Sequence, residues 1–307
     1  MSSTDERVPT QLVAIFGPTA VGKTGVAIAL AGLLRERGED PVAVSCDAIQ
    51  VYDGLGILSG AVSEEEQGVL EHRLVGFVPV DGEFSAGRFA ALAHAEIDQL
   101  LAERRRPLVV GGTGLYLRAA LADLDLRPPV PSEIRAAVEQ EVEERGAPAL
   151  HAELDPDLAA GVHPNDRKRV ARLTGLSRAG IYPHASARGM WTEGLRRPTL
   201  LIGLTLDRDA LRERIDNRVE EMRDRGVEAE VKRADAAGAS RTARAAIGFE
   251  EVLRGDLEGT KSAQRAYARR QLTWMRKMPG VETVDRTGIE DDEVAARIAA
   301  RLERDEV

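Results

Sequence analysis

A short glycine-rich stretch near the start of the sequence has the residue types and spacing needed to hold a phosphate chain. The segment 17–24 reads GPTAVGKT, in which two glycines separated by four residues are followed by a lysine and a hydroxyl residue. In such a loop the backbone amides surround phosphate oxygens, the lysine adds a positive charge and the hydroxyl can bind Mg²⁺. The alternative is an ordinary glycine-rich turn. We predict a phosphate site formed by Gly17, Thr19, Ala20, Val21, Gly22, Lys23 and Thr24, with Mg²⁺ at Thr24.

Two polar side chains follow other apolar segments and could act on a ligand of this loop. Asp47 follows the apolar run 42–45, and Thr113 lies in the glycine-rich turn 111–116, which follows the apolar run 107–110. If both runs are strands of one parallel sheet, their carboxyl ends meet at the edge where such sheets bind ligands. Asp47 is then a catalytic candidate, and Thr113 is the side chain of its turn that could hydrogen-bond a ligand. The alternatives are a turn or capping aspartate, and glycines that only permit tight strand-to-helix packing.

Basic residues gather in two segments of an otherwise acidic sequence. Residues 166–172 read DRKRVAR and residues 269–277 read RRQLTWMRK, both with helical spacing. Such runs usually form solvated helix faces that pair with nearby carboxylates. The second run also contains Trp274, and an aromatic ring among arginines suits phosphates and an unstacked base. RNA contacts are therefore the alternative that these residues leave open.

The elements that would position these residues form a sheet domain interrupted by a helical insertion. Apolar runs predict strands, and amphipathic spacing predicts helices between them. The expected strands are 11–16, 42–45, 74–80, 107–110, 199–206 and 281–285. The expected helices are 23–34, 85–103, 132–145, 147–154, 166–174, 208–225, 227–237 and 262–277, before a charged terminal helix. We predict an α/β fold whose P-loop NTPase-like parallel sheet core, flanked by helices, comprises residues 1–124 and 195–307, with an inserted all-helical domain at 125–194.

The overall composition excludes several classes of protein. The sequence has 307 residues, 43% of them hydrophobic, which is enough for a well-buried core. Cys46 is its one cysteine, which excludes internal disulfides and cysteine-based zinc modules. No apolar run approaches the roughly 20 residues of a membrane helix and the polar start lacks a signal-peptide core, so we expect no membrane association and a cytoplasmic protein. The net charge of -9 argues against a broad basic surface, so any nucleic acid must be bound by local patches.

These segments together resemble one family, the bacterial tRNA dimethylallyltransferases, also called tRNA isopentenyltransferases or IPP transferases. The resemblance covers nearly the whole sequence, and several motifs are more specific than the phosphate loop, which many NTPases share. The motifs that carry the resemblance, the phosphate loop included, are GPTAVGKT at 17, Asp47 with Gln50-Val51-Tyr52, SAGRF at 85, VGGTGLY at 110, HPNDRKR at 163, WTEGL at 191, the helix pattern Arg214, Arg218, Met222 and Gly226, AIGFEE at 246 and RRQLTWMRK at 269. The sequence departs from the family at Ala48, where serine is usual, at 58–62, where Gly-Thr-Ala-Lys-Pro is usual, and at Arg73 and Glu250.

The resemblance implies that a dimethylallyl group passes from dimethylallyl diphosphate to the exocyclic amine of the adenosine 3′ of the tRNA anticodon, after that base is flipped out. It implies Mg²⁺, a monomer, diphosphate in the loop beside Arg218, and catalytic roles for Asp47, Thr113, Lys23 and Arg218. An adenine amine is a weak nucleophile, so a carboxylate such as Asp47 helps by accepting its proton. The helical insertion would bind tRNA. The implied tRNA-binding residues are Asp47, Ala48, Ile49, Gln50, Thr113, Arg135, Lys168, Arg169, Arg172, Gly248, Arg269, Arg270, Gln271, Trp274 and Arg276.

Two other classes of function compete with the transferase. An NTP-dependent kinase would use the same loop for ATP, with Asp47 as a metal ligand. A purely RNA-binding module is disfavoured by the acidic net charge and by two glycine-rich turns that converge on one sheet edge. Turnover distinguishes the three: a kinase consumes ATP with an acceptor, the transferase releases diphosphate from dimethylallyl diphosphate only when RNA is present, and a binding module forms no product.

Overall fold

The computed structural model describes residues 11–181 and 194–305, and the chain divides into two compact units. Unit 1 comprises Met1–Asp123 and Met190–Val307, and unit 2 comprises Leu124–Gly189. Trp191, Thr192 and Glu193, which belong to one of the family motifs, lie outside the described residues. That the helical insertion binds tRNA stays a prediction.

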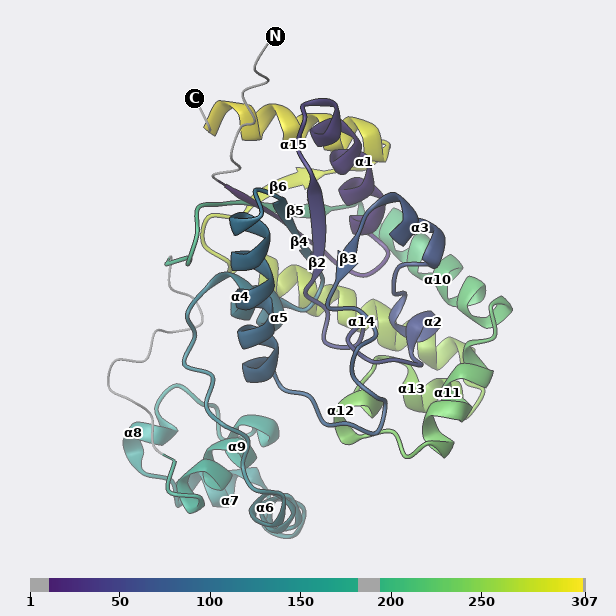
Figure 1. Ribbon diagram of the computed structural model, residues 1–307. Coiled ribbons are helices and arrows are strands. Elements are labelled where there is room, and N and C mark those ends of the chain that lie inside the picture. Colours follow the sequence, from purple (N-terminus) through teal and green to yellow (C-terminus); the bar gives the residue numbers. More distant parts are fainter. Residues whose placement is uncertain (1–10, 182–193, 306–307) are drawn as a thin grey trace. The chain divides into compact units, whose positions relative to one another are not determined.

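Within the described residues, unit 1 is built on a parallel sheet of six strands in the order β3-β2-β4-β1-β5-β6 (Figure 1). Every residue of β1, β2 and β4 is buried, as expected for a parallel sheet that is covered on both faces. This double burial explains why these strands appear in the sequence as continuous apolar runs. The strands are β1 Leu12–Phe16, β2 Pro41–Ser45, β3 His72–Arg73, β4 Arg106–Gly111, β5 Thr199–Thr205 and β6 Glu282–Asp285.

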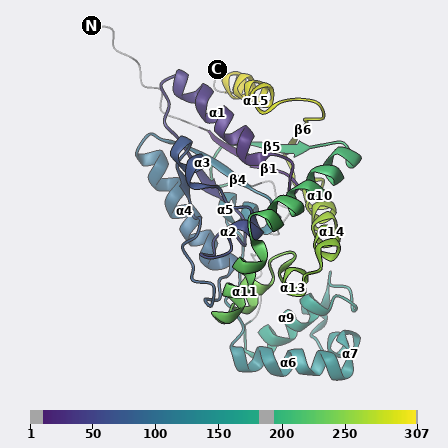
Figure 2. The same cartoon turned by 90° about the vertical axis from the view of Figure 1, so that its right-hand side faces the viewer.

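Helices cover both faces of this sheet (Figures 1 and 2). On one face α1 packs beside α15 over alternate residues of β1, β4 and β5, forming an extensive apolar cluster. On the other face α4 and α5 pack against β4, and Met275 of α14 covers Gly203 of β5. In the described residues no helix is long and apolar enough to cross a membrane. The helices of unit 1 are α1 Lys23–Glu36, α2 Gly56–Ser59, α3 Glu64–Val69, α4 Ala86–Ala102, α5 Gly114–Leu121, α10 Arg208–Asp224, α11 Val227–Ala236, α12 Arg241–Arg244, α13 Phe249–Leu253, α14 Leu257–Met275 and α15 Asp291–Asp305.

The described residues of unit 2 form helices around a small core of their own. Its buried cluster contains Val138 and Val142 of α6, Leu150 of α7 and Val170 of α9. The α9 helix begins after Asp166, whose side chain accepts a hydrogen bond from the amide of Arg169 and so caps the helix. The helices are α6 Ser132–Arg145, α7 Ala147–Ala152, α8 Pro156–Ala159 and α9 Arg167–Arg178.

Most predicted elements are present, but the strand predicted at 74–80 is wrong. Leu74 has a left-handed backbone with φ 62°, which ends β3 after two residues. The amides of Phe77 and Val78 both donate to Val51 O at 2.9 Å, so this segment packs on the turn after β2 and adds no strand. The short helices α2, α3, α8, α12 and α13 were not predicted, because four to six residues contain no repeat of apolar spacing.

Burial on the α1 face of the sheet predicts which leucines hold the fold together. Leu30 of α1 is fully buried in the main cluster, whereas Leu92 of α4 is 39% exposed. Leu30→Ala should lower the free energy of unfolding by about 2–5 kcal/mol, because it leaves a cavity in the core. Leu92→Ala should change it by less than about 1 kcal/mol. Chemical denaturation of both variants measures the difference, and equal losses would contradict this assignment of the core.

Candidate active site

The phosphate loop lies between β1 and α1, and its two pattern glycines are required by close packing. A Cβ on Gly17 would lie 2.9 Å from Leu204 O, and a Cβ on Gly22 would lie 2.1 Å from Arg286 Nη1. Gly22 also has φ 91° and directly precedes α1. The amino end of α1, with its unpaired amides and positive dipole end, therefore borders the place where a phosphate chain would bind.

Lys23 contributes a cation whose proton is held weakly. Its Nζ donates to Gly17 O at 3.1 Å and to Pro18 O at 2.9 Å. Burial, with a further contribution from the guanidinium of Arg218, lowers the pKa of Lys23 to about 8, although the carboxylate of Asp47 partly opposes this change. Two cations are thus brought together beside one carboxylate, and an anionic ligand would relieve their repulsion.

Asp47 lies at the carboxyl end of β2 as predicted, and its charge reaches several neighbouring groups. Its Oδ1 accepts hydrogen bonds from the amides of Ile49 at 2.9 Å and Gln50 at 3.4 Å, which fix the carboxylate in an Asx turn. Oδ2 is then free to meet a ligand. After the effect of burial, the Asp47 charge is the largest influence on the pKa of Tyr267, which it raises. The contacts of Oδ1 agree with the alternative of a turn aspartate, and the catalytic role of Asp47 stays a prediction.

The second glycine-rich turn follows β4, and its glycines face protein atoms. A Cβ on Gly111 would lie 2.5 Å from Cys46 O, one on Gly112 2.3 Å from Gln271 Nε2, and one on Gly114 2.4 Å from the Trp274 ring. These glycines therefore serve tight internal packing, which was the alternative interpretation of this turn. Thr113 lines a cavity, as Gly111 also does.

The hydroxyl of Thr113 has one partner in the turn after β2 and another on α14. Its Oγ1 accepts a hydrogen bond from the amide of Ala48 at 3.2 Å and lies 3.3 Å from the hydroxyl of Tyr267. Sequence reasoning did not identify Tyr267, although it lies one turn before Gln271 on the same helix face, a spacing that could have indicated it. The Ala48 contact also ties the turn that contains Asp47 to the turn that contains Thr113.

Arg218 of α10 reaches the short helix α2 across the cavity. Its Nη2 donates to Ser59 O at 3.3 Å, and a Cβ on Gly60 would lie 1.7 Å from the same nitrogen. Gln50 Nε2 donates to Gly60 O at 3.1 Å. The buried carboxylate of Glu230 accepts hydrogen bonds from the amides of Ile57 and Leu58 in α2, both at 2.8 Å. No sequence signal singled out Glu230, because an acidic residue in a helix usually faces solvent.

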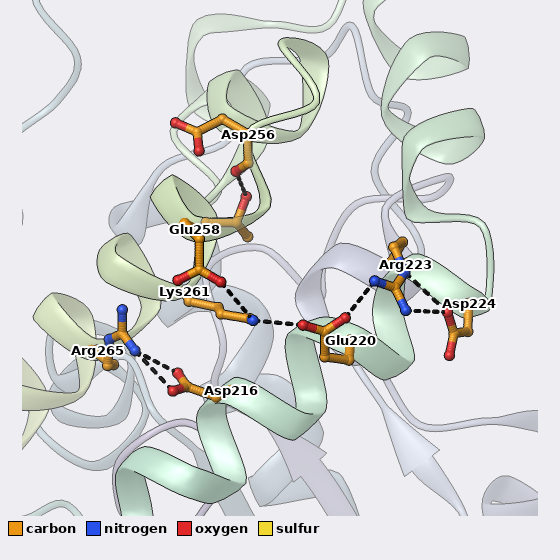
Figure 3. A network of polar contacts seen from close by, with 9 residues as sticks. Asp216, Glu220, Arg223, Asp224, Asp256, Glu258, Lys261 and Arg265 are labelled. Atoms are coloured by element: carbon orange, nitrogen blue, oxygen red, sulfur yellow. Dashed lines mark hydrogen bonds and ion pairs between the residues drawn. The ribbon is translucent and has the colours of Figure 1, made fainter.

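Ion pairs hold α10 against α14 (Figure 3). Arg265 Nη1 lies 2.8 Å from both carboxylate oxygens of Asp216, and Lys261 Nζ lies 2.5 Å from Glu220. These pairs occupy the side of α10 that faces α14. They leave the side that contains Arg218 turned toward the cavity, so the pairing sets the direction of this arginine.

One cavity of about 810 Å³ in unit 1 brings most of the predicted chemistry together. Gly17 and Val21 lie outside its lining, and the other predicted phosphate residues belong to it. The predicted residues that line it are Thr19, Ala20, Gly22, Lys23, Thr24, Asp47, Ala48, Ile49, Gln50, Thr113, Arg218 and Gln271. A site with a cationic end, a carboxylate and tyrosine rings can hold a phosphorylated ligand beside a second, neutral one.

The residues predicted to bind RNA from α14 divide into two groups. Arg269, Arg270 and Arg276 are exposed on the helix surface. Gln271 is buried: its Oε1 accepts the amide of Thr19 at 2.8 Å, and its Nε2 donates to Gly112 O at 2.7 Å. The Trp274 ring packs over Gly114. Gln271 therefore links the two glycine-rich turns to each other, a role that sequence reasoning did not anticipate.

The other predicted RNA-binding residues have similarly varied environments. In unit 2, Lys168 and Arg169 are exposed, and Arg135 of α6 is partly exposed. Arg172 donates to Arg127 O at 3.0 Å and Pro128 O at 2.8 Å, so it also fixes the segment before α6. In unit 1, Gly248 is buried with φ 96° at the start of α13.

The residues around the phosphate loop are compatible with Mg²⁺. In the described part of the chain no three or more His, Cys, Asp or Glu side chains gather as a metal site. Mg²⁺ often takes only one or two protein ligands, with substrate phosphates and water completing its shell. The hydroxyl residue Thr24 and the carboxylate of Asp47 both line the cavity and could serve in this way.

Comparisons with known proteins agree over nearly the whole chain. The model of the IPP transferase family matches residues 50–278. The chain is 41% identical over 280 residues to the tRNA dimethylallyltransferase of Rhodospirillum centenum, which covers 85% of this chain and 87% of that protein. It is 34% identical over 301 residues to that of Acetivibrio thermocellus, covering 92% and 94%.

Solved structures are similar as well. The tRNA isopentenylpyrophosphate transferase of Bacillus halodurans has a TM-score of 0.68 at 32% identity and covers 96% of this chain and 98% of its own. A eukaryotic dimethylallyltransferase acting on tRNA has a TM-score of 0.75 at 23% identity and covers 97% and 79%, a likeness of fold.

The low pKa of Lys23 predicts how the affinity for inorganic diphosphate depends on pH. The ligand favours the charged ammonium, whose pKa is about 8 before binding. Relative to the Lys23→Arg variant, which stays charged and shares the ligand's own titration, the affinity of the wild-type protein should therefore be unchanged up to that pH and then fall by up to about tenfold per pH unit, because binding must take up a proton. Calorimetry between about pH 7 and pH 9.5 measures the fall. Parallel profiles of diphosphate affinity against pH in the wild-type protein and in Lys23→Arg would contradict the prediction.

Proposed function

Because this chain belongs to the IPP transferase family, we propose that it transfers a dimethylallyl group from dimethylallyl diphosphate to the exocyclic amine of the adenosine 3′ of the anticodon in tRNA. The observation that supports this most is the arrangement of Lys23 and Arg218 beside Asp47 in one cavity. Cations suit a diphosphate leaving group, and a carboxylate suits an amine that must lose a proton. The proposal takes the enzyme to act as a monomer.

The diphosphate end of the reaction is assigned to the phosphate loop. The bond between the allylic carbon and the diphosphate oxygen breaks, and its electron pair leaves with the diphosphate. Negative charge therefore grows on the leaving group, where the loop amides, Lys23 and Arg218 stabilise it. Mg²⁺ held at Thr24 would supply further positive charge to the phosphate oxygens.

The adenine end is assigned to Asp47 and Thr113. As the new bond forms between the allylic carbon and the adenine nitrogen, that nitrogen loses a proton, and Oδ2 of Asp47 accepts it. The Asx turn with Ile49 and Gln50 keeps Oδ2 in place. The hydroxyl of Thr113, held by Ala48 and Tyr267, lies next to this turn and can hydrogen-bond the adenine.

A turnover assay tests the proposal directly. Purified protein is incubated with labelled dimethylallyl diphosphate and bulk tRNA, and label in RNA and free diphosphate are measured. Both should appear together and only when tRNA is present. Consumption of ATP in place of dimethylallyl diphosphate would support a kinase, and RNA binding without product would contradict an enzyme.

Replacing Asp47 separates a proton acceptor from a metal ligand. Asp47→Asn keeps the shape of the side chain but removes the base, so turnover should fall by roughly 10²-fold or more. Affinity for dimethylallyl diphosphate should hardly change. A variant that binds diphosphate poorly and recovers turnover when the Mg²⁺ concentration is raised would show a metal-binding role in place of the base.

The exposed basic side chains of α9 are proposed to contact tRNA phosphates. The double variant Lys168→Ala/Arg169→Ala should reduce the slope of log affinity against log salt by about 1.5, since each phosphate contact contributes about 0.7–0.9. Filter binding of tRNA over a salt series measures the slope. Lys232→Ala on α11, another exposed lysine, is the matched control and should leave it unchanged. Equal slopes in all three proteins would remove α9 from the RNA interface.

A further inference from the structure

A buried arginine near the end of the chain contacts the phosphate loop from behind. Arg286 directly follows β6 and is 3% exposed. Its Nη1 donates to Val21 O at 2.9 Å and, more weakly, to Gly22 O at 3.4 Å, and its Nη2 donates to Ile289 O at 3.3 Å. This residue lies outside the segment that the family model matches, residues 50–278.

These contacts favour one direction for two loop amides. In a planar trans peptide the carbonyl and the following N–H point in opposite directions. When Arg286 holds Val21 O, it turns the N–H of Gly22 the other way. Gly22 O also accepts the amide of Val26 at 3.2 Å, so the first turn of α1 directs the N–H of Lys23 and the weaker contact from Arg286 adds to it. Gly22 and Lys23 line the cavity, whereas Val21 does not. Arg286 thus binds the carbonyl side of the peptides whose amide side is offered to a ligand.

A carboxylate holds the arginine in this position. Asp291, the first residue of α15, lies 2.7 Å from Arg286 Nη1. The same carboxylate packs over α1, where a Cβ on Gly25 would lie 1.8 Å from Asp291 Oδ2. Glycine inside a helix is destabilising relative to alanine. The close approach of Asp291 explains why this costly residue stands in the first turn of α1.

We propose that Arg286, held by Asp291, is a positioning residue that orients the phosphate-loop amides toward the diphosphate group. It acts through the loop and does not touch the substrate. The proposal rests on the proposed function in one respect, namely that the ligand of the loop is a diphosphate. It assigns part of the diphosphate site to the segment between β6 and α15.

The first test removes the guanidinium. Arg286→Met should weaken binding of inorganic diphosphate by about tenfold or more, in line with the loss of a charge-assisted hydrogen bond, and should leave the tRNA dissociation constant within about twofold. Arg301→Met is the matched control: Arg301 Nη2 pairs with Glu282 at 2.9 Å and also joins α15 to β6, but away from the loop. It should leave diphosphate affinity within about twofold.

The second test keeps both charges and is the safeguard if Arg286→Met does not fold. Gly25→Ala places a methyl group where the Asp291 carboxylate lies, so the pair must shift and diphosphate affinity should fall by several-fold. Gly32→Ala is the control on the same helix, because a Cβ there meets nothing within 4 Å. Melting temperatures without ligand show whether each variant is folded.

Four outcomes overturn the proposal or separate it from the proposed function. Wild-type diphosphate affinity in Arg286→Met and Gly25→Ala overturns it. Parallel losses of diphosphate affinity, tRNA affinity and melting temperature also overturn it, since they indicate a general structural role. A wild-type protein that binds inorganic diphosphate but transfers no dimethylallyl group contradicts the proposed function alone, whereas one that does not bind diphosphate contradicts both.

Discussion

Burial of two cations in one cavity is the constraint on which the site depends. Lys23 and Arg218 face one cavity, and each loses some of its affinity for protons through burial. Asp47 compensates for only part of this cost. A site of this kind favours a ligand with several negative charges, a property that suits the diphosphate proposed as its ligand.

The fold holds these buried cations in place through hydrogen bonds between elements that are far apart in sequence. Gln271 on α14 links the phosphate loop to the turn that follows β4, and it does so from a buried position. Glu230 on α11 fixes the start of α2, whose last residue in turn accepts a hydrogen bond from Arg218. The cations therefore remain close together because neutral and acidic side chains hold the backbone around them.

The sequence was most informative where a local motif is enough to indicate the position and role of a residue. The phosphate loop, Asp47 after β2 and Thr113 after β4 could be placed because parallel strands deliver their carboxyl ends to one edge. Family motifs added α10 and its Arg218. The fold class and the main strands followed from continuous apolar runs.

Sequence reasoning failed where the partner of a residue is distant. Nothing near Gln271 indicates that its amide fills a gap between two glycine-rich turns, or that the ring of Trp274 packs over Gly114. Leu74–Val80 has the composition of a strand, but a left-handed residue and the acceptor Val51 O redirect it. Such outcomes depend on contacts that form only in the folded chain.

The link between Thr19 and Gln271 spans 252 positions, which has a consequence for synthesis on the ribosome. Domains begin to fold from the amino end during translation, at about 5–20 residues per second. The loop emerges first, yet the amide of Thr19 finds its native acceptor only after α14 has left the exit tunnel. A nascent chain can thus form β1 and α1 early, but its phosphate loop reaches its final shape only when most of the polypeptide has been made.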